Sequence, residues 1–158
     1  MMKSYLQILH DSLDKKLELL IRIEEKSLEQ AAMLKNPEVD LDAVDTNMDE
    51  KAELIKEVLS LDNGFESIYE KIREQLIADK ENYKDEIKTL KVLIEKVTER
   101  STSIQAVEAR NKAQMEMFFN TQKKGLQSKR NAMSVARDYY QNMNNVKHVT
   151  PQFLDRKK

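Results

Sequence analysis

The chain has 158 residues, a length that one domain accounts for, and a net charge of −1. It holds two Gly, two Pro and no Cys, and 35% of its residues are charged, against roughly 25% in an average protein. This composition excludes a disulfide framework and a thiolate zinc site, and it favours long helices. Because no apolar run can span a bilayer and the start lacks a signal peptide's apolar block, we expect a cytoplasmic protein without stable membrane insertion.

The first predicted helix spans residues 4–35, with Ser4 as its N-cap. Apolar residues recur there at steps of three and four, the period of a helix that buries one face. The predicted core positions are Leu6, Leu9, Leu13, Leu17, Leu20, Leu28, Ala31 and Leu34. Asn36-Pro37 ends the helix, because the proline ring disfavours helical geometry in the residue before it.

The second predicted helix spans residues 40–79, with Asp40 as its N-cap and a bend or break at Asn63-Gly64. Its apolar positions are Leu41, Val44, Met48, Ile55, Leu59, Phe65, Tyr69, Ile72 and Leu76. No Gly or Pro marks its end. We place a turn at residues 79–82, immediately before a more regular repeat begins.

The third predicted helix spans residues 82–143 and carries a coiled-coil heptad, with alternating steps of four and three. The heptad positions are Tyr83, Ile87, Leu90, Ile94, Val97, Ser101, Ile104, Glu108, Asn111, Met115 and Phe118. Beyond Phe118 the register shifts by four residues, through Gln122 and Leu126, and continues to Met143. Asparagines 142, 144 and 145 end the helix, and Pro151 keeps the tail, residues 144–158, extended.

The third helix also contains the basic part of the chain. Residues 1–100 hold 16 Lys or Arg and 24 Asp or Glu, whereas residues 101–158 hold 11 and 4. At 1.5 Å per residue, the first helix is about 48 Å long and the third about 93 Å, so the first cannot cover the third. Unless the long helix bends at residues 101–103 or Gly125, its basic half overhangs. The sequence therefore predicts one all-α domain: an elongated antiparallel bundle or coiled coil of three long helices, the second bent near Gly64, with a C-terminal overhang.

The overhang, about residues 109–143, holds more apolar side chains than one heptad line can bury. One side of the helix carries Met115, Phe118, Phe119 and Leu126, and other sides carry Met117, Val135 and Tyr139. A core role is favoured for Met115, Phe118 and Met133, because heptad positions are usually buried. A contact surface is an equal alternative for Met117, Phe119, Tyr139 and Tyr140, since Met and aromatic side chains suit adaptable protein-binding surfaces.

No catalytic or metal site is visible in the sequence. The two histidines, His10 and His148, lie at opposite ends of the chain, and carboxylates such as Glu24 and Glu50 repeat on polar helix faces. We therefore predict a binding protein without enzymatic activity, cofactor or metal. The alternative class is a structural coiled-coil or nucleic-acid-associated protein that uses the basic arm, with Lys123, Lys124, Lys129 and Arg130. We expect no nucleic acid, because no reader motif surrounds these residues.

Several segments resemble flagellar export chaperones of the FlgN type. The segments are VEARNKAQMEMFF, YYQNM and the ending PQFLDRKK, in which the matching residues are Arg110, Asn111, Tyr139, Tyr140, Phe153, Leu154 and Asp155. The acidic segment 48–72 and the heptads of 83–97 are similar to the middle of that family, so the resemblance begins near residue 45. Chaperones of the FliT type share the same small helical design and stay an alternative.

The resemblance implies a cytoplasmic chaperone of type III flagellar export. Such a protein masks the amphipathic termini of hook–filament junction proteins (FlgK- or FlgL-like) and delivers them to the export gate and its ATPase complex; a FliT-like protein serves the filament cap protein instead. On that basis the predicted client-binding residues are Met115, Phe118, Phe119, Leu126, Met133 and Tyr140. Tyr139, which lies off this stripe, is the predicted export-gate contact. A homodimer of the free protein is possible.

Overall fold

The computed structural model describes residues 1–121 and Tyr139, and within them all regular structure is helical. Helix α1 (Met2–Leu34) is followed by α2 (Leu41–Ala78), a short 3₁₀ helix η1 (Lys80–Tyr83) and α3 (Lys84–Thr121). The all-α fold of packed long helices is therefore confirmed. Most of the predicted arm, residues 122–138 and 140–143, and the tail, residues 144–158, lie outside the described residues.

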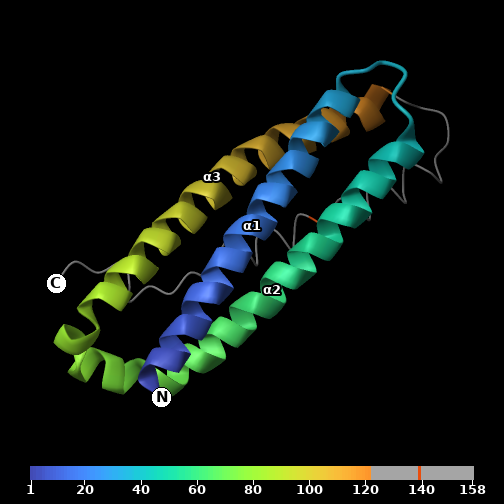
Figure 1. The fold of residues 1–158 in the computed structure, drawn as a ribbon. Helices are drawn as coiled ribbons and strands as arrows, with labels where there is room; N and C mark the ends of the chain where they lie inside the picture. The colour runs from blue at the N-terminus through green and yellow to red at the C-terminus, as the bar shows by residue number, and fades with distance from the viewer. Residues whose placement is uncertain (122–138, 140–158) are drawn as a thin grey trace.

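The three helices form an elongated bundle with α1 in the middle, as Figure 1 shows. The chain runs along α1, back along α2 and forward again along α3, so α1 is antiparallel to α2 and parallel to α3 (Figure 1). α1 packs against both neighbours, whereas no Cα atom of α2 lies within 8 Å of a Cα atom of α3. Any contact between α2 and α3 is therefore made by side chains.

Local sequence signals account for most helix ends. α1 stops at Leu34, before Asn36-Pro37, and the Asp40 carboxylate accepts a hydrogen bond from the Asp42 N–H at the start of α2. Ser4 is not the N-cap, because α1 begins at Met2 and the Tyr5 N–H donates to the Met1 carbonyl. Met2 is 6% exposed, and its burial favours a helix that begins before the expected cap.

The two weakest boundary signals had different outcomes. The unmarked turn is real, since α2 ends at Ala78 and η1 leads into α3 at Lys84. At Asn63-Gly64 there is no break, because α2 continues as one helix across these residues (Figure 1). A glycine inside a helix costs about 1 kcal/mol relative to alanine, which a helix of this length tolerates.

An uninterrupted heptad, unlike the apolar pattern, describes the buried side of α1. Its buried positions follow alternating steps of three and four, and they include three polar residues: Leu6, Leu9, Leu13, Lys16, Leu20, Ile23, Ser27, Gln30 and Leu34. Of the predicted core positions, Leu28 is 53% exposed and Leu17 and Ala31 are half-buried. Those three residues lie one position away from the true heptad, so the apolar pattern was wrong at these positions. The other five predicted positions, Leu6, Leu9, Leu13, Leu20 and Leu34, are buried as predicted.

The buried positions of the other two helices also follow heptad steps and also include polar residues. α2 buries Val44, Met48, Lys51, Ile55, Val58, Asp62, Phe65, Tyr69, Ile72 and Leu76 at heptad steps. In α3 the predicted heptad is correct up to Met115, with Ser101 half-buried and Glu108 and Asn111 buried. The next buried residue is Phe119 at 3% exposure, whereas Phe118 is half-buried. The register shift therefore begins one step earlier than predicted.

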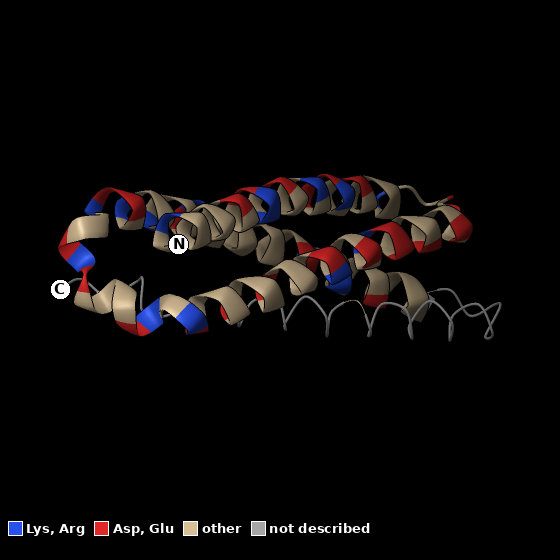
Figure 2. Cartoon of the chain, turned by 60° about the horizontal axis from the view of Figure 1, so that its bottom comes forward, with Lys and Arg blue, Asp and Glu red and all other residues tan. Residues whose placement is uncertain are grey.

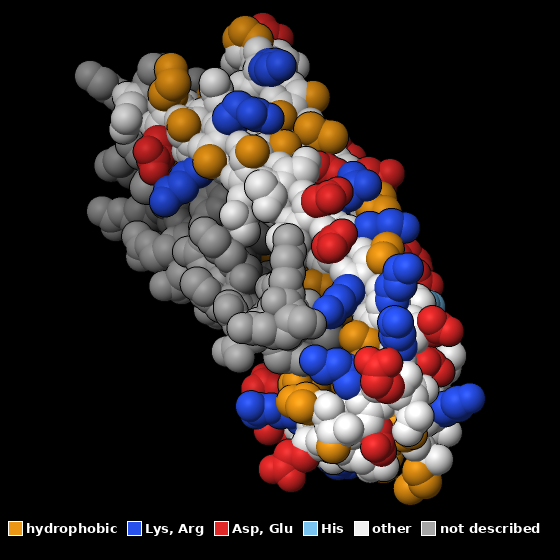
Figure 3. All heavy atoms as spheres, turned by 90° about the vertical axis from the view of Figure 1, so that its left-hand side faces the viewer, with side chains coloured by type: hydrophobic (Ala, Val, Ile, Leu, Met, Phe, Trp, Pro, Cys, Tyr) orange, Lys and Arg blue, Asp and Glu red, His pale blue; other side chains and the backbone are white. Residues whose placement is uncertain are grey.

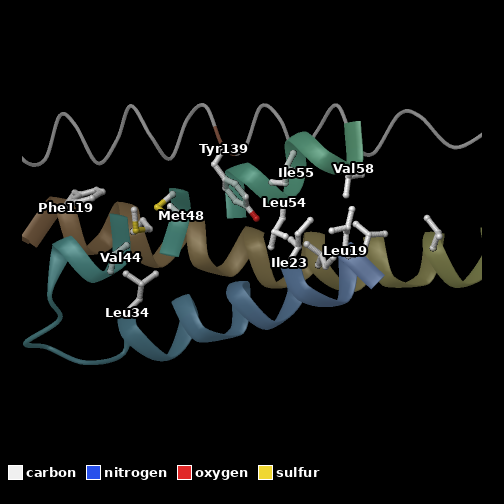
Figure 4. Close-up of a cluster of buried hydrophobic side chains, with 14 residues drawn as sticks. Leu19, Ile23, Leu34, Val44, Met48, Leu54, Ile55, Val58, Phe119 and Tyr139 are labelled. Carbon is white, nitrogen blue, oxygen red and sulfur yellow. The ribbon is translucent and has the colours of Figure 1, made fainter. Parts of the chain in front are cut away.

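The core divides into two apolar clusters along the bundle. At one end, which we call the apolar end, lie Met2, Leu6, Leu9, Leu13, Phe65, Tyr69, Ile72, Leu76, Leu90, Leu93 and Ile94. The other part, which we call the Lys51 half, contains Leu19, Leu20, Ile23, Leu34, Val44, Met48, Leu54, Ile55, Val58, Val97, Ile104, Met115, Phe119 and Tyr139 (Figure 4). A buried ion pair separates them, in which Lys16 Nζ lies 2.8 Å from Asp62 Oδ1.

The position of Tyr139 corrects the predicted overhang. Lys51 Nζ contacts Glu108 of α3 at 3.0 Å and lies 4.3 Å from the centre of the Tyr139 ring. A straight helix would separate residues 108 and 139 by about 46 Å along its axis. Because both side chains contact the same ammonium group, Tyr139 belongs to the bundle core and is not part of an overhang.

Candidate functional site

The most unusual group in the described part of the molecule is the Lys51 ammonium, buried at the centre of the Lys51 half. The Lys51 side chain has no exposed surface. Its Nζ donates hydrogen bonds to Gln30 Oε1 of α1 and to Glu108 Oε1 of α3, the latter at 3.0 Å. A single lysine on α2 thus connects all three helices, including the pair that has no close backbone contact.

The environment of Lys51 explains why a buried charge is tolerated there. Burial lowers the pKa of Lys51, and the charge and hydrogen bond of Glu108 oppose that shift. The Glu108 side chain is itself only 4% exposed, so the two groups form a buried ion pair. Removing one partner of such a pair leaves the other charge uncompensated, so the two residues depend on each other.

Tyr139 completes this site from a distant part of the chain. Its side chain is 1% exposed and points from its backbone into the apolar cluster near Ile55 and Met48 (Figure 4). The ring covers the Lys51 ammonium at 4.3 Å, a cation–π distance. Four segments that are far apart in sequence therefore meet at one ammonium group.

Further polar contacts join α1 to its neighbours in the same half. The Asn111 side-chain amide of α3 donates to the Ser27 carbonyl at 2.8 Å, and that of Asn47 on α2 donates to the Lys26 carbonyl at 3.0 Å. Both amides donate to backbone carbonyl groups of α1, which can accept a second hydrogen bond in addition to the one within the helix. These contacts fix the axial position of each neighbouring helix relative to α1.

Glu24 forms a polar clamp between α1 and α3. Its two carboxylate oxygens accept hydrogen bonds from Arg100 and Ser103 of α3. Burial acts to raise the pKa of Glu24, but the hydrogen bonds from Ser103 and Arg100 and the guanidinium charge outweigh it, so the pKa is lowered. The expectation that Glu24 belongs to a simple solvated face is therefore wrong.

The predicted client-binding residues on α3 are largely inside the bundle. Met115 and Phe119 are each 3% exposed, and Phe119 packs among the core residues of the Lys51 half. Phe118 is half-buried, with its ring edge-on to Phe119 at a centroid distance of 5.7 Å. Met117 is 60% exposed and points to a different side. The expectation that Phe119 protrudes from an unpacked arm is thus wrong, because the shifted register turns it inward.

Tyr139 is also placed differently from its prediction. A contact with an export gate requires an accessible side chain, and Tyr139 is buried against Lys51 in this structure. Three further predicted client-binding residues, Leu126, Met133 and Tyr140, lie outside the described residues. The structure therefore brings together Met115, Phe119 and Tyr139, while the binding roles of all these residues stay predictions.

Sequence reasoning missed Lys51 and Gln30 as site residues because it sought apolar side chains. The signal that finds them is the heptad itself: extending steps of three and four from Leu13 to Leu34 passes through Lys16, Ser27 and Gln30. The same extension on α2 passes through Lys51 and Asp62. A charged residue at a core heptad position implies a partner on a facing helix.

The surface of the described helices gives no sign of another chemical site. Acidic and basic residues follow each other along all three helices (Figure 2), and on the face seen in Figure 3 they are interspersed with single hydrophobic side chains. Among the described residues, no three His, Asp or Glu side chains are arranged to hold a metal ion. Nor does any described helix combine the length and apolar character needed to cross a membrane.

Comparison with known proteins identifies no relative: no family model, curated protein or solved structure matches this chain. The fold and the site therefore define its class by themselves. It is an elongated helical bundle in which a buried lysine joins three helices. The aromatic ring above that lysine comes from a segment outside the described helices.

Proposed function

We propose that this protein is a chaperone of flagellar type III export, which binds the amphipathic terminal helices of hook–filament junction proteins in the cytoplasm. The sequence resemblance gives the proposal its client class. The structural observation that supports it is the burial of Tyr139 against Lys51 of α2, in the apolar cluster that also contains Met48, Met115 and Phe119. These aromatic and Met side chains line one place where a helix of a client can pack.

Two features favour this face as the client site. α2 and α3 have no Cα atoms within 8 Å of each other, so the space between them is filled by side chains and not by direct helix packing. The side chains that line it include Met48 and Met115, whose unbranched shape adapts to different partners. An incoming amphipathic helix could place its apolar stripe against these residues.

In this proposal the client competes with Tyr139. The Tyr139 ring occupies the apolar space and covers Lys51 when no client is bound. A client helix that offers an aromatic or large aliphatic side chain at this position replaces the ring, and Lys51 remains paired with Glu108. Binding therefore exchanges one apolar contact for another, which keeps it reversible.

The test is a titration of the full chain with synthetic terminal helices of a junction protein, followed by NMR of the methionine methyl groups. We expect saturable shifts of Met48 and Met115. Tyr139→Leu weakens the competing contact, which is worth about 2 kcal/mol for a desolvated cation–π pair, so client affinity should rise by up to about thirtyfold. Tyr5→Leu, a half-buried tyrosine at the apolar end, is the matched control and should leave affinity unchanged.

The alternatives give different results in the same titration. Selective binding of a filament cap terminus would identify the FliT-like function, which uses the same mechanism. Binding of DNA or RNA with a steep salt dependence, and of neither client, would favour the nucleic-acid-associated class. If client helices bind equally well to wild type and Tyr139→Leu, the exchange mechanism is wrong even though a client is recognised.

A further inference from the structure

Gly64 has no explanation inside the monomer. It lies in the middle of α2, where glycine is less favourable than every residue except proline. A Cβ atom built at Gly64 meets nothing within 4 Å, so no neighbour in the described structure requires the missing side chain. An exposed glycine in a long helix is useful where another backbone approaches closely.

A groove of about 500 Å³ surrounds Gly64 on the outer side of α1 and α2. From α2 it is lined by Ser60, Leu61, Phe65, Ser67 and Ile68, and from α1 by Asp11, Ser12 and Ile8, of which Ile8 is 48% exposed. Toward the other end of the bundle, an ion pair of 2.9 Å between Lys26 and Glu50 spans the two helices. The open apolar part is thus confined to the region around Gly64.

The residues on either side of Gly64 are complementary in size. Three residues away, Leu61 precedes the glycine and Ser67 follows it; four residues away, Ser60 precedes it and Ile68 follows it. If a second α2 crosses antiparallel over Gly64, residue i of one copy faces residue 128 minus i of the other. Each large apolar side chain then faces a serine, Leu61 against Ser67 and Ile68 against Ser60.

The charges follow the same symmetry. Glu57 and Lys71 lie seven residues before and after Gly64, about 10.5 Å along the helix in each direction and on the same face. Both side chains are exposed, and neither forms an ion pair with another described residue. In the antiparallel crossing, Glu57 of each copy faces Lys71 of the other, which gives two equivalent ion pairs.

We propose that this face is a homodimer interface, in which two copies of α2 cross antiparallel at Gly64 about a two-fold axis. A two-fold interface uses the same patch on both copies and must be self-complementary, and this patch is so in both size and charge. The small residues at the crossing allow a short distance between the helix axes. This interface lies outside the Tyr139 site and does not depend on the proposed chaperone function.

The first test is sedimentation of the full chain between about 1 μM and 1 mM, the range in which weak dimers dissociate. Wild type should pass from monomer to dimer. Gly64→Leu should stay monomeric throughout, because the added side chain holds the helices apart. Its melting temperature should be unchanged or raised, since nothing in the monomer meets the new side chain. Loss of dimer without loss of folding separates the interface from stability.

The second test is a charge exchange. Lys71→Glu and Glu57→Lys should each weaken the dimer by about tenfold or more, because like charges then face each other twice. The double variant Glu57→Lys/Lys71→Glu restores opposite charges and should recover wild-type dimerisation. Lys88→Glu, an exposed lysine on α3, makes the same charge change away from the groove and should have no effect.

Two results would overturn the proposal. One is a wild-type chain that remains monomeric over the whole range. The other is a dimer that persists in Gly64→Leu or is not restored by the double charge variant, because such a dimer uses a different surface.

Discussion

The two ends of the bundle use the same heptad geometry with different side chains. At the apolar end, leucine, isoleucine and aromatic residues occupy nearly every buried position. In the Lys51 half, the corresponding positions include Ser27, Gln30, Lys51, Glu108 and Asn111. Apolar side chains pack in several registers with similar energy, whereas a buried ammonium has one set of partners. Both parts bury apolar side chains, so we expect both to supply stability and the Lys51 half also to fix which helices face each other.

The comparison also bears on the proposed function. A segment that must leave and return needs a position that is specific but not the main source of stability. Tyr139 contacts the Lys51 half, where polar groups define the position, and the apolar cluster of the other end joins residues of all three helices without Tyr139. The bundle can thus remain folded while one contact of the Lys51 half is exchanged.

The largest expected effect is the loss of Lys51. Lys51→Met leaves Glu108 buried without its partner and should reduce the free energy of unfolding by about 3–5 kcal/mol. The double variant Lys51→Met/Glu108→Leu removes both charges and should recover most of that loss. Urea unfolding of the three proteins measures this. A double variant as unstable as the single one would mean that the ion pair is not the reason for the loss.

Phe119→Ala should be nearly as damaging, because Phe119 is 3% exposed in the core. Truncation of a buried Phe costs about 3–5 kcal/mol, and Leu90→Ala at the apolar end should cost about 2–5 kcal/mol. Phe118→Ala, next to it and half-buried, should cost less than either. Thermal unfolding of the three variants compares the two ends directly. A mild effect of Phe119→Ala would mean that Phe119 is not buried in the core.

Tyr139→Leu should have a smaller effect on the free protein. Leucine retains apolar volume but not the aromatic face above Lys51, so the loss should be about 2 kcal/mol, the value of a desolvated cation–π contact. The variant should also expose Met48 and Met115 methyl groups to solvent probes in NMR. If stability and methyl exposure both stay at wild-type values, the Tyr139 contact contributes nothing measurable.

The smallest effects concern pH, and they have opposite signs at two carboxylates. The folded-state pKa of Glu24 is lowered, so its contribution is present above its unfolded value of 4.5 and is lost as pH falls through the lowered pKa. Burial raises the pKa of Asp62 against the opposing effect of Lys16, so its contribution is present below 3.8 and is lost as pH rises through the raised pKa.

Acid titration of stability in Glu24→Gln and Asp62→Asn checks both signs. Relative to wild type, Glu24→Gln should lose less stability on acidification below about pH 4.5, because the titrating group is gone. As pH falls through the raised pKa of Asp62, wild type should gain stability from this group, and Asp62→Asn should lack that gain. Equal pH profiles for the two variants and wild type would contradict both assignments.

Much of the fold could be predicted from local sequence, for reasons that operate within a few residues. Proline at position 37 disfavours helix in the residue before it, and Asp40 can cap the next helix wherever the chain goes. The heptad from Leu90 to Met115 is regular enough to name buried polar positions such as Glu108 before any partner is known. The turn near residue 80 follows from the change in period alone.

Which side chain meets which was decided only by the tertiary structure. Leu28 is as apolar as Leu20, but Leu20 faces the neighbouring helices and Leu28 faces away from them, so only Leu20 is buried. Phe118 and Phe119 are equivalent in sequence, and a register shift of one residue chose between them. Lys51 is inside because Gln30, Glu108 and Tyr139 converge on it from three distant segments. A local pattern carries no information about such a convergence, because it depends on how whole helices are placed against each other.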